Sequence, residues 1–118
     1  MTCLLVLSDV DVVQSYENFT GGVVMSLIEH GFCAPEEAAE FFTVENLTAP
    51  AGGLPLNTSG GNLAEAYIHG LELVVEAVRQ VRGESVNQVA NAKVSLVSSG
   101  PMVIPASNVL FGTEEVLG

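Results

Sequence analysis

Basic residues are scarce in this 118-residue sequence, which has three Lys and Arg against 14 Asp and Glu and a formal net charge of −11. Proteins that bind nucleic acid need clustered positive charge to neutralise phosphates. The composition therefore argues against a nucleic-acid partner and, for the same reason, against an anionic membrane surface. An acidic excess of this kind is typical of a solvated protein surface.

Cysteine is also scarce, and the two that are present, Cys3 and Cys33, form neither a metal-binding spacing nor a Cys-x-x-Cys pair. We therefore expect no metal site. The apolar start at 1–7 has no basic residues before it and no cleavage-site pattern, so it does not resemble a signal peptide. The expected location is a reducing cytoplasm, in which both thiols stay free.

Long hydrophobic runs are missing, although hydrophobic residues make up 48% of the chain and its mean hydropathy is +0.45. Polar residues and glycines interrupt every apolar stretch before it reaches the roughly 18 residues that a membrane span needs. For a small domain this apolar content is high. We therefore expect part of the surface to be covered by another subunit or a partner domain.

Apolar periodicity and turn residues divide the chain into helices and strands. The predicted order is a strand at 9–15, helices at 19–30 and 35–42, a loop at 44–55, a helix at 63–81, and strands at 93–98 and 107–111. Thr20 is expected to cap the first helix, and the longest helix to bury a face that includes Tyr67 and Leu71. The pattern predicts an α/β fold in layers, with helices packed on a mixed sheet whose last two strands are antiparallel.

Two adjacent glycines, Gly60 and Gly61, lie between an extended approach at 52–56 and the longest predicted helix. Glycines at such a junction let the backbone come close to a ligand or to another chain segment. The first turn of a helix also offers free N–H groups and the positive end of the helix dipole. The junction is therefore a candidate site for an oxyanion or a thioester oxygen, with Tyr67 and His69 one turn further along.

Three short motifs carry a resemblance to a known family. Residues 16–19 read Tyr-Glu-Asn-Phe, residues 57–61 read Asn-Thr-Ser-Gly-Gly, and residues 66–70 read Ala-Tyr-Ile-His-Gly. They are similar, in order, to the Asn-Glu-Ala-Phe, Asn-x-x-Gly-Gly and Gly-His-Pro-x-Gly motifs of thiolases. Over roughly residues 9–112 the chain resembles the C-terminal half of a thiolase-superfamily enzyme of the lipid-transfer-protein or sterol-carrier-protein-X type. Residues 1–118 would then form a single, partial thiolase-like C-terminal domain.

The departures from the thiolase motifs concern the reacting groups. In thiolases an Asn and a His build the oxyanion hole, whereas the matching positions here are Tyr16 and Tyr67. The late Cys-x-Gly motif is absent, and residues 98–101 lie roughly where it would fall. Cys3 and Cys33 match neither thiolase cysteine. Because thiolysis needs a thiolate nucleophile and an acid/base cysteine, we do not expect ordinary thiolase activity.

Steroid side-chain aldolases are the branch that suits two tyrosines, because they resemble lipid-transfer-type thiolases without the cysteines. They split a β-hydroxy acyl-CoA by retro-aldol cleavage into a ketone and a shorter acyl-CoA. Such a reaction needs a base for the hydroxyl proton and donors for the enolate oxygen. The resemblance implies catalytic roles for Tyr16 and Tyr67, with His69 able to tune Tyr67 through a relay. The alternatives are two packed core tyrosines and a solvated or structural histidine.

The resemblance also implies the surroundings of the two tyrosines. The residues expected to line the acyl-CoA pocket are Asn57, Gly60, Gly61, Ser99 and Gly100. Coenzyme A is expected only as part of the substrate, with no other cofactor. Expected partners are the other thiolase-fold half, a second copy in a homodimer, and an OB-fold, zinc-ribbon acyl-CoA-associated protein. Two alternative functions stay open: an acyl-CoA acyltransferase completed by a partner, and a non-catalytic lipid- or acyl-CoA-binding module.

Overall fold

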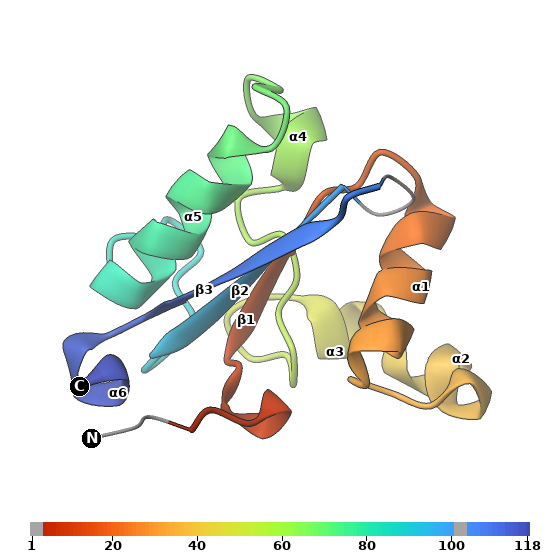
Figure 1. The fold of residues 1–118 in the computed structure, drawn as a ribbon, viewed down its shortest axis with the longest axis horizontal. Helices are drawn as coiled ribbons and strands as arrows, with labels where there is room; N and C mark the ends of the chain where they lie inside the picture. The colour runs from red at the N-terminus through yellow and green to blue at the C-terminus, as the bar shows by residue number, and fades with distance from the viewer. Residues whose placement is uncertain (1–3, 101–103) are drawn as a thin grey trace.

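The computed structural model describes residues 4–100 and 104–118, and a mixed three-stranded sheet runs through the middle of this part of the chain (Figure 1). The strands are β1 (Val12–Ser15), β2 (Val94–Ser99) and β3 (Ser107–Gly112), in the spatial order β1-β2-β3. β1 is parallel to β2, and β3 is antiparallel to β2. The predicted mixed sheet and antiparallel closing pair are therefore confirmed. The first strand is shorter than predicted, since residues 7–9 form a 3-10 turn.

The free edge of β1 is paired by the extended segment at 55–57, which was predicted as the approach to the glycine turn. Val13 donates its N–H to the carbonyl oxygen of Pro55, and Asn57 donates its N–H to that of Val13. All four residues of β1 are buried, as expected for a strand covered on both faces. This pairing brings Asn57 to the end of β1, next to Tyr16.

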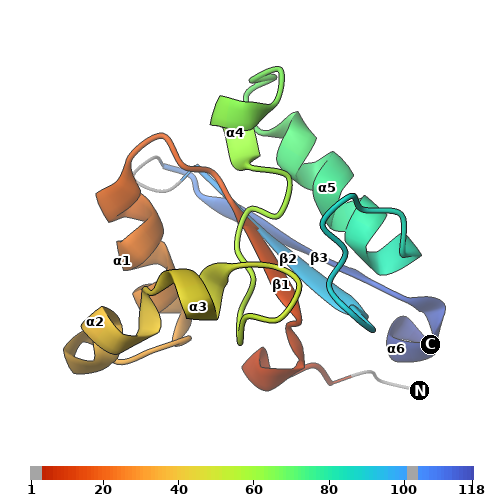
Figure 2. The same cartoon turned by 180° about the vertical axis from the view of Figure 1, so that it is seen from behind.

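Helices cover both faces of the sheet (Figures 1 and 2). On one face α1 (Thr20–His30) packs Val23 and Leu27 against Val13 and Leu96. The helix ends at Gly31 as predicted, with a left-handed φ of +91°. The prediction that Thr20 caps α1 is wrong, because the N-cap residue is Phe19 and Thr20 already lies in the first turn.

Two short helices follow α1. The predicted 35–42 helix is a 3-10 helix at Pro35–Glu37 continued by α2 (Ala38–Phe41). The segment predicted as a loop at 44–55 contains α3 (Val44–Leu47), whose first turn is capped by the Thr43 hydroxyl accepting from the backbone N–H of Asn46. A four-residue helix is too short to show an apolar period in the sequence. The sequence feature that could have predicted α3 is the capping residue, Thr43.

The single long helix predicted at 63–81 is wrong. The structure has α4 (Gly61–Ala64) and α5 (Leu71–Arg82), separated by a loop at 65–70. The loop breaks the helix because Tyr67, His69 and Gly70 have φ values of +48°, +49° and +91°, which an α-helix cannot contain.

The predicted buried face of this helix is also wrong. The residues that α5 buries against the sheet are Glu72, Leu73, Glu76, Ala77 and Gln80. By contrast, Leu71 is 55% exposed and Tyr67, in the loop before α5, is 43% exposed. Three of the five buried residues are polar, so an apolar pattern could not identify this face.

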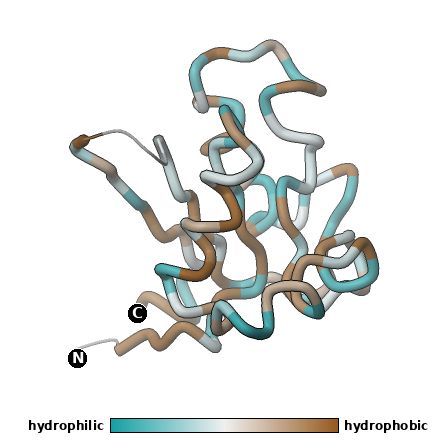
Figure 3. The backbone as a smooth tube through the Cα atoms, turned by 90° about the vertical axis from the view of Figure 1, so that its right-hand side faces the viewer, coloured by the Kyte–Doolittle hydropathy of each residue, from teal (hydrophilic) through white to brown (hydrophobic). Residues whose placement is uncertain are grey.

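The chain ends in α6 (Glu114–Leu117), which lies near the N-terminal segment (Figures 1 and 2). That segment is apolar, as the brown tube near the N label in Figure 3 shows, and Leu4 and Val6 are 84% and 54% exposed. Other large apolar side chains that are well exposed are Phe19, Val44, Leu63, Val86 and Ile104. Among the described residues, no helix is both long and apolar enough to cross a bilayer.

Candidate active site

Tyr16 and Tyr67, which are 51 residues apart in the sequence, meet in the structure. Tyr16 follows β1 directly, and its backbone N–H is bonded to the carbonyl oxygen of Ser98 in β2. Tyr67 lies in the loop between α4 and α5. The Tyr16 hydroxyl donates to the Tyr67 hydroxyl at 3.2 Å, and the two rings are edge to face with centroids 6.2 Å apart. The pair therefore joins the rigid sheet to an exposed loop.

Gly70 allows the loop to approach Tyr16. Its φ is +91°, and a Cβ placed on it would lie 2.9 Å from Cδ2 of Tyr16. Any other residue would therefore combine an unfavourable left-handed backbone with a clash against the aromatic ring. This glycine lies within the helix predicted at 63–81, but its role is the close packing of a loop on Tyr16.

A cavity of about 410 Å³ adjoins Tyr16 at the ends of β1 and β2. It is lined by Tyr16, Asn18, His69, Ser99, Gly100 and Pro105. Four of these residues were predicted site residues. Asn18 and Pro105 were not, although Asn18 belongs to the 16–19 motif and its polar side chain was an available signal.

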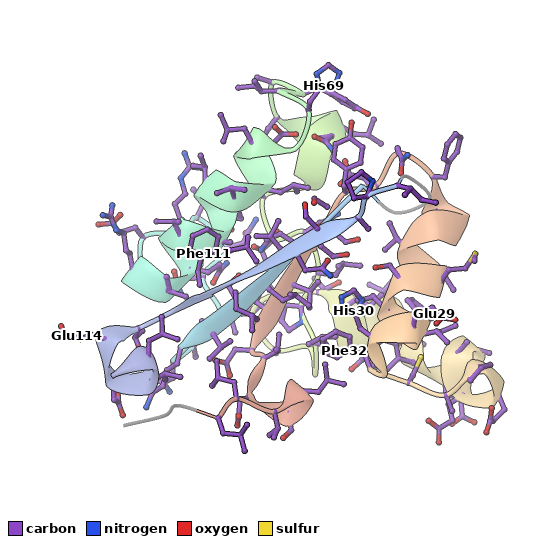
Figure 4. All side chains as sticks on the ribbon, in the orientation of Figure 1. Glu29, His30, Phe32, His69, Phe111 and Glu114 are labelled. Atoms are coloured by element: carbon purple, nitrogen blue, oxygen red, sulfur yellow. The ribbon has the colours of Figure 1, made fainter. Side chains whose placement is uncertain are left out.

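His69 lies on the loop that joins α4 to α5 (Figure 4). Its ring packs edge to face against that of Tyr67, with centroids 6.0 Å apart. In the described part of the chain, no hydrogen bond joins His69 to either tyrosine. The predicted relay from His69 to Tyr67 therefore stays a prediction. The other histidine, His30, lies beside Phe32 near the end of α1 and approaches the carbonyl oxygen of Ser26.

The environment of Tyr16 raises its pKa to about 12. The largest cause is the hydrogen bond to Tyr67, followed by loss of hydration and then by the charges of Tyr67, Glu72 and Glu17. Each of these effects disfavours a phenolate at this position. At neutral pH Tyr16 is protonated, as an ordinary tyrosine also is, and it can serve as a hydrogen-bond donor.

The glycine turn is held by the chain itself. Asn57 accepts from the backbone N–H of Ser15 at 2.7 Å and donates to Oε2 of Glu17 at 2.9 Å. The other carboxylate oxygen of Glu17 accepts from the backbone N–H of Asn62. A Cβ on Gly61 would lie 2.5 Å from the same carboxylate. The anion at the start of α4 is thus Glu17, where the sequence had suggested an external oxyanion or a thioester oxygen.

The three predicted binding residues of this turn lie apart from the Tyr16 cavity. Asn57 and Gly60 border a second hollow of about 320 Å³, together with Thr58 and Asn87. Gly61 is buried against Glu17. Their predicted contact with substrate stays a prediction, whereas their part in shaping the turn is visible in the structure.

A buried polar network beneath α5 was missed by sequence reasoning. Oε1 of Glu76 accepts from the hydroxyls of Thr58 and Ser85, each at 2.6 Å, and from Gln80 at 3.1 Å. Gln14 of β1 also donates to Thr58. The available signal was the spacing of Glu72, Glu76 and Gln80, which places them on one face of a helix.

Cys33 is free and buried, and loss of hydration raises the pKa of its thiol, with a smaller effect from Glu37. Its environment is that of a small buried hydrophobic residue. Cys3 and Pro101 lie outside the described residues. Within 4–100 and 104–118, no group of three or more His, Cys, Asp and Glu side chains is placed to hold a metal ion.

Comparison with known proteins identifies the family. A family profile described as "Thiolase C-terminal domain-like" matches residues 4–113. The chain is 46% identical over 107 residues to the steroid side-chain-cleaving aldolase of Thermomonospora curvata, and 43% identical over 105 residues to the 17-hydroxy-3-oxo-4-pregnene-20-carboxyl-CoA lyase of Mycobacterium tuberculosis.

These matches cover 91% and 89% of this chain but 27% of each relative, so the chain spans about a quarter of their length. A solved structure described as the Ltp2-ChsH2(DUF35) aldolase superposes with a TM-score of 0.87 at 45% identity, covering 97% of this chain and 29% of that one. The α/β fold and the predicted resemblance are thereby confirmed at the level of the superfamily. The chain belongs to the thiolase C-terminal domain-like family.

Proposed function

We propose that this chain is the C-terminal part of an acyl-CoA carbon–carbon lyase of the lipid-transfer-type branch, acting on a steroid side chain. The observation that carries the proposal is the hydrogen-bonded pair of Tyr16 and Tyr67 beside an open cavity. Relatives named as an aldolase and a carboxyl-CoA lyase, 46% and 43% identical respectively, support it. The substrate would be a β-hydroxy acyl-CoA.

The proposed reaction is a retro-aldol cleavage. The hydroxyl on the β-carbon loses its proton, its O–H electrons form the carbonyl of the released ketone, and the bond between the α- and β-carbons breaks. The electrons of that bond form the enolate of the shorter acyl-CoA, which is then protonated at its α-carbon. Atoms and charge balance without an oxidant, a reductant or a cofactor beyond the coenzyme A that the substrate carries.

We assign a different part to each tyrosine. Tyr16, which lines the cavity, would turn its single O–H from Tyr67 to the developing enolate oxygen and donate there, as oxyanion-hole donors do. Tyr67, which is hydrogen-bonded to Tyr16, would take up the hydroxyl proton as it gives its own O–H proton to His69. His69, which lines the cavity and packs on Tyr67, would accept that proton.

The direct test replaces each tyrosine by Phe in the full-length enzyme that contains this chain. Tyr16→Phe and Tyr67→Phe are each expected to lower the rate of ketone release by roughly 10²- to 10³-fold, the usual effect of removing one oxyanion-hole donor. Binding of the acyl-CoA is expected to persist, because the rings remain. Calorimetric titration of the acyl-CoA and ketone release measured by chromatography separate the two effects.

Thr113→Val is a matched control, since it also deletes a hydroxyl, and that hydroxyl has no hydrogen-bond partner among the described residues. It should leave turnover unchanged. Wild-type ketone release in both tyrosine variants would overturn the assignment. Thiolytic cleavage by free coenzyme A, with no ketone formed, would point to an acyltransferase.

We further propose that the remaining thiolase-fold half and a second copy of the enzyme complete the acyl-CoA surface in the cytoplasm. The exposed apolar side chains, among them Phe19 at 62% and Leu63 at 83%, support a covered surface. An OB-fold, zinc-ribbon acyl-CoA-associated protein is the other proposed partner. Co-purification of the full-length enzyme with such a protein is the check.

A further inference from the structure

We propose that Glu72 is a positioning residue that holds the loop at 65–70 in the conformation that brings Tyr67 to Tyr16. This proposal rests on the lyase function proposed above. Glu72 lies in the first turn of α5 and is 4% exposed. Oε2 of its carboxylate accepts a hydrogen bond from the backbone N–H of Ile68 at 3.0 Å.

The loop needs such a restraint because its backbone is strained. Ile68 lies between Tyr67 and His69, whose φ values of +48° and +49° are in the left-handed region. Left-handed backbone is unfavourable for a non-glycine residue and persists only where its surroundings hold it in place. The Glu72 carboxylate accepts a hydrogen bond from the N–H of Ile68, the residue between these two strained residues.

Side-chain packing supplies only part of this restraint, through the contact of the Tyr67 ring with Tyr16. Tyr67 is 43% exposed and Ile68 is 56% exposed. Among the described residues, the loop backbone has two further bonds to α5, from the N–H of Leu71 to the carbonyl oxygen of Ile68 at 3.2 Å and from the N–H of Leu73 to that of Gly70 at 3.1 Å. Both lie at or after Ile68, so the bond from the Ile68 N–H to Glu72 is the one nearest to Tyr67.

The second carboxylate oxygen of Glu72 indicates that burying this side chain lowers the stability of the fold. Oε1 is buried and has no hydrogen-bond partner among the described residues. A buried carboxylate with an unpaired oxygen lowers stability compared with an apolar residue of similar size. A gain in stability therefore does not explain why a glutamate occupies position 72. The hydrogen bond from its carboxylate to the strained loop does.

Loss of the hydrogen bond between Glu72 and Ile68 should lower turnover more than it weakens substrate binding. Tyr67 does not line the described cavity, whereas Tyr16 and His69 do. If the loop moves, the contact between the two hydroxyls opens while most of the cavity wall remains. A displacement of about 1 Å in a reacting group can lower a rate by as much as 10²-fold.

The test uses three substitutions in the full-length enzyme. Glu72→Ala removes the acceptor, and Glu72→Asp keeps the charge but withdraws the carboxylate by one methylene. Both are expected to lower kcat by roughly tenfold or more, with KM changed by less than about threefold. Glu72→Gln keeps an oxygen that accepts from the Ile68 N–H, so it should retain kcat within about threefold.

Glu65→Ala is the matched control. It removes an acid from the other end of the same loop, and the partner of Glu65 is the Arg79 guanidinium. It should leave kcat unchanged. Wild-type kcat in Glu72→Asp, or Glu72→Gln as impaired as Glu72→Ala, would overturn the proposal, the second by showing that charge matters and the hydrogen bond does not. If Glu72→Ala fails to fold, the Asp and Gln variants still decide.

A readout independent of activity separates this proposal from the proposed function. Amide hydrogen exchange in the peptide that contains residues 66–70 should be faster in Glu72→Asp than in the wild type, and unchanged in Glu72→Gln and Glu65→Ala. This result is expected even if the wild-type enzyme cleaves no β-hydroxy acyl-CoA. Equal exchange in all four proteins would refute the role of Glu72 and leave the tyrosine chemistry untouched.

Discussion

At the scale of single residues, the two tyrosines are coupled through one hydrogen bond. That bond is the largest cause of the pKa of about 12 at Tyr16. Tyr67→Phe removes the acceptor, so the pKa of Tyr16 should fall toward the ordinary tyrosine value of about 10. Absorbance titration of the phenolate, compared between the wild type and Tyr67→Phe, measures the change.

The same shift has a consequence for stability. Because folding raises the pKa of Tyr16 above its unfolded value, this group stabilises the fold below about pH 10, and the contribution is lost as the pH rises toward 12. The free energy of unfolding should therefore fall less steeply over that range in Tyr67→Phe. Identical titrations and identical pH dependence in both proteins would contradict the coupling.

Gly70 offers a second prediction at this scale. Gly70→Ala should lower the free energy of unfolding by about 1–2 kcal/mol through its left-handed backbone, and should also lower ketone release, because the new Cβ would press on the Tyr16 ring. Urea denaturation and a turnover assay measure the two effects.

Gly83→Ala separates strain from contact in that experiment. Gly83 has a φ of +73°, and nothing lies within 4 Å of a Cβ placed on it. It should lose similar stability and keep full turnover. Equal turnover in the two variants would show that the packing of Gly70 on Tyr16 is unimportant for the reaction.

Residue spacing was a good guide to the tyrosine pair and a poor guide to the glycine turn. The motifs at 16–19 and 66–70 predicted that Tyr16 and Tyr67 share a site, and the structure places their hydroxyls together. The motif at 57–61 could not reveal that the carboxylate of Glu17 accepts the hydrogen bond from the backbone N–H of Asn62. A motif records which residues are present, but which partner satisfies a backbone donor depends on the tertiary fold.

At the scale of elements, strands were predicted better than helices. β1 and β2 are short runs of nearly all buried residues in which valine recurs and which end near turn residues, so pattern and structure agree. The 63–81 helix failed because apolar residues continue at helical spacing through the loop at 65–70. Left-handed backbone at Tyr67 and His69 leaves no mark on hydrophobic periodicity, since neither residue is a glycine.

The polar face of α5 leads to a prediction for the whole element. Glu76 is 2% exposed and accepts from three side chains. Glu76→Ala leaves these donors buried without their acceptor, so the free energy of unfolding should fall by about 3 kcal/mol. Val75→Ala, at a 41% exposed position on the same helix, should cost far less. Urea denaturation of both variants is the measurement, and equal losses would contradict the importance of the network.

At the scale of the whole molecule, the function proposed above makes the described residues one wall of a larger site. The Tyr16 cavity opens where β1 and β2 end, and the chain spans 27% of the curated relatives that it matches. From its apolar content, the sequence predicted that another subunit or a partner domain covers part of the surface. It could not show which surface would be covered, because exposure depends on packing across the whole fold.

The two phenols are attached to the molecule in unequal ways. Tyr16 extends a strand that is paired on both sides, by β2 and by residues 55–57, whereas Tyr67 stands on a six-residue connection outside the sheet. Substitutions in that connection can therefore reposition Tyr67 while the folding core stays unchanged. If Tyr67 has the role proposed above, relatives that prefer substrates of different size should differ in sequence mainly at residues 65–70.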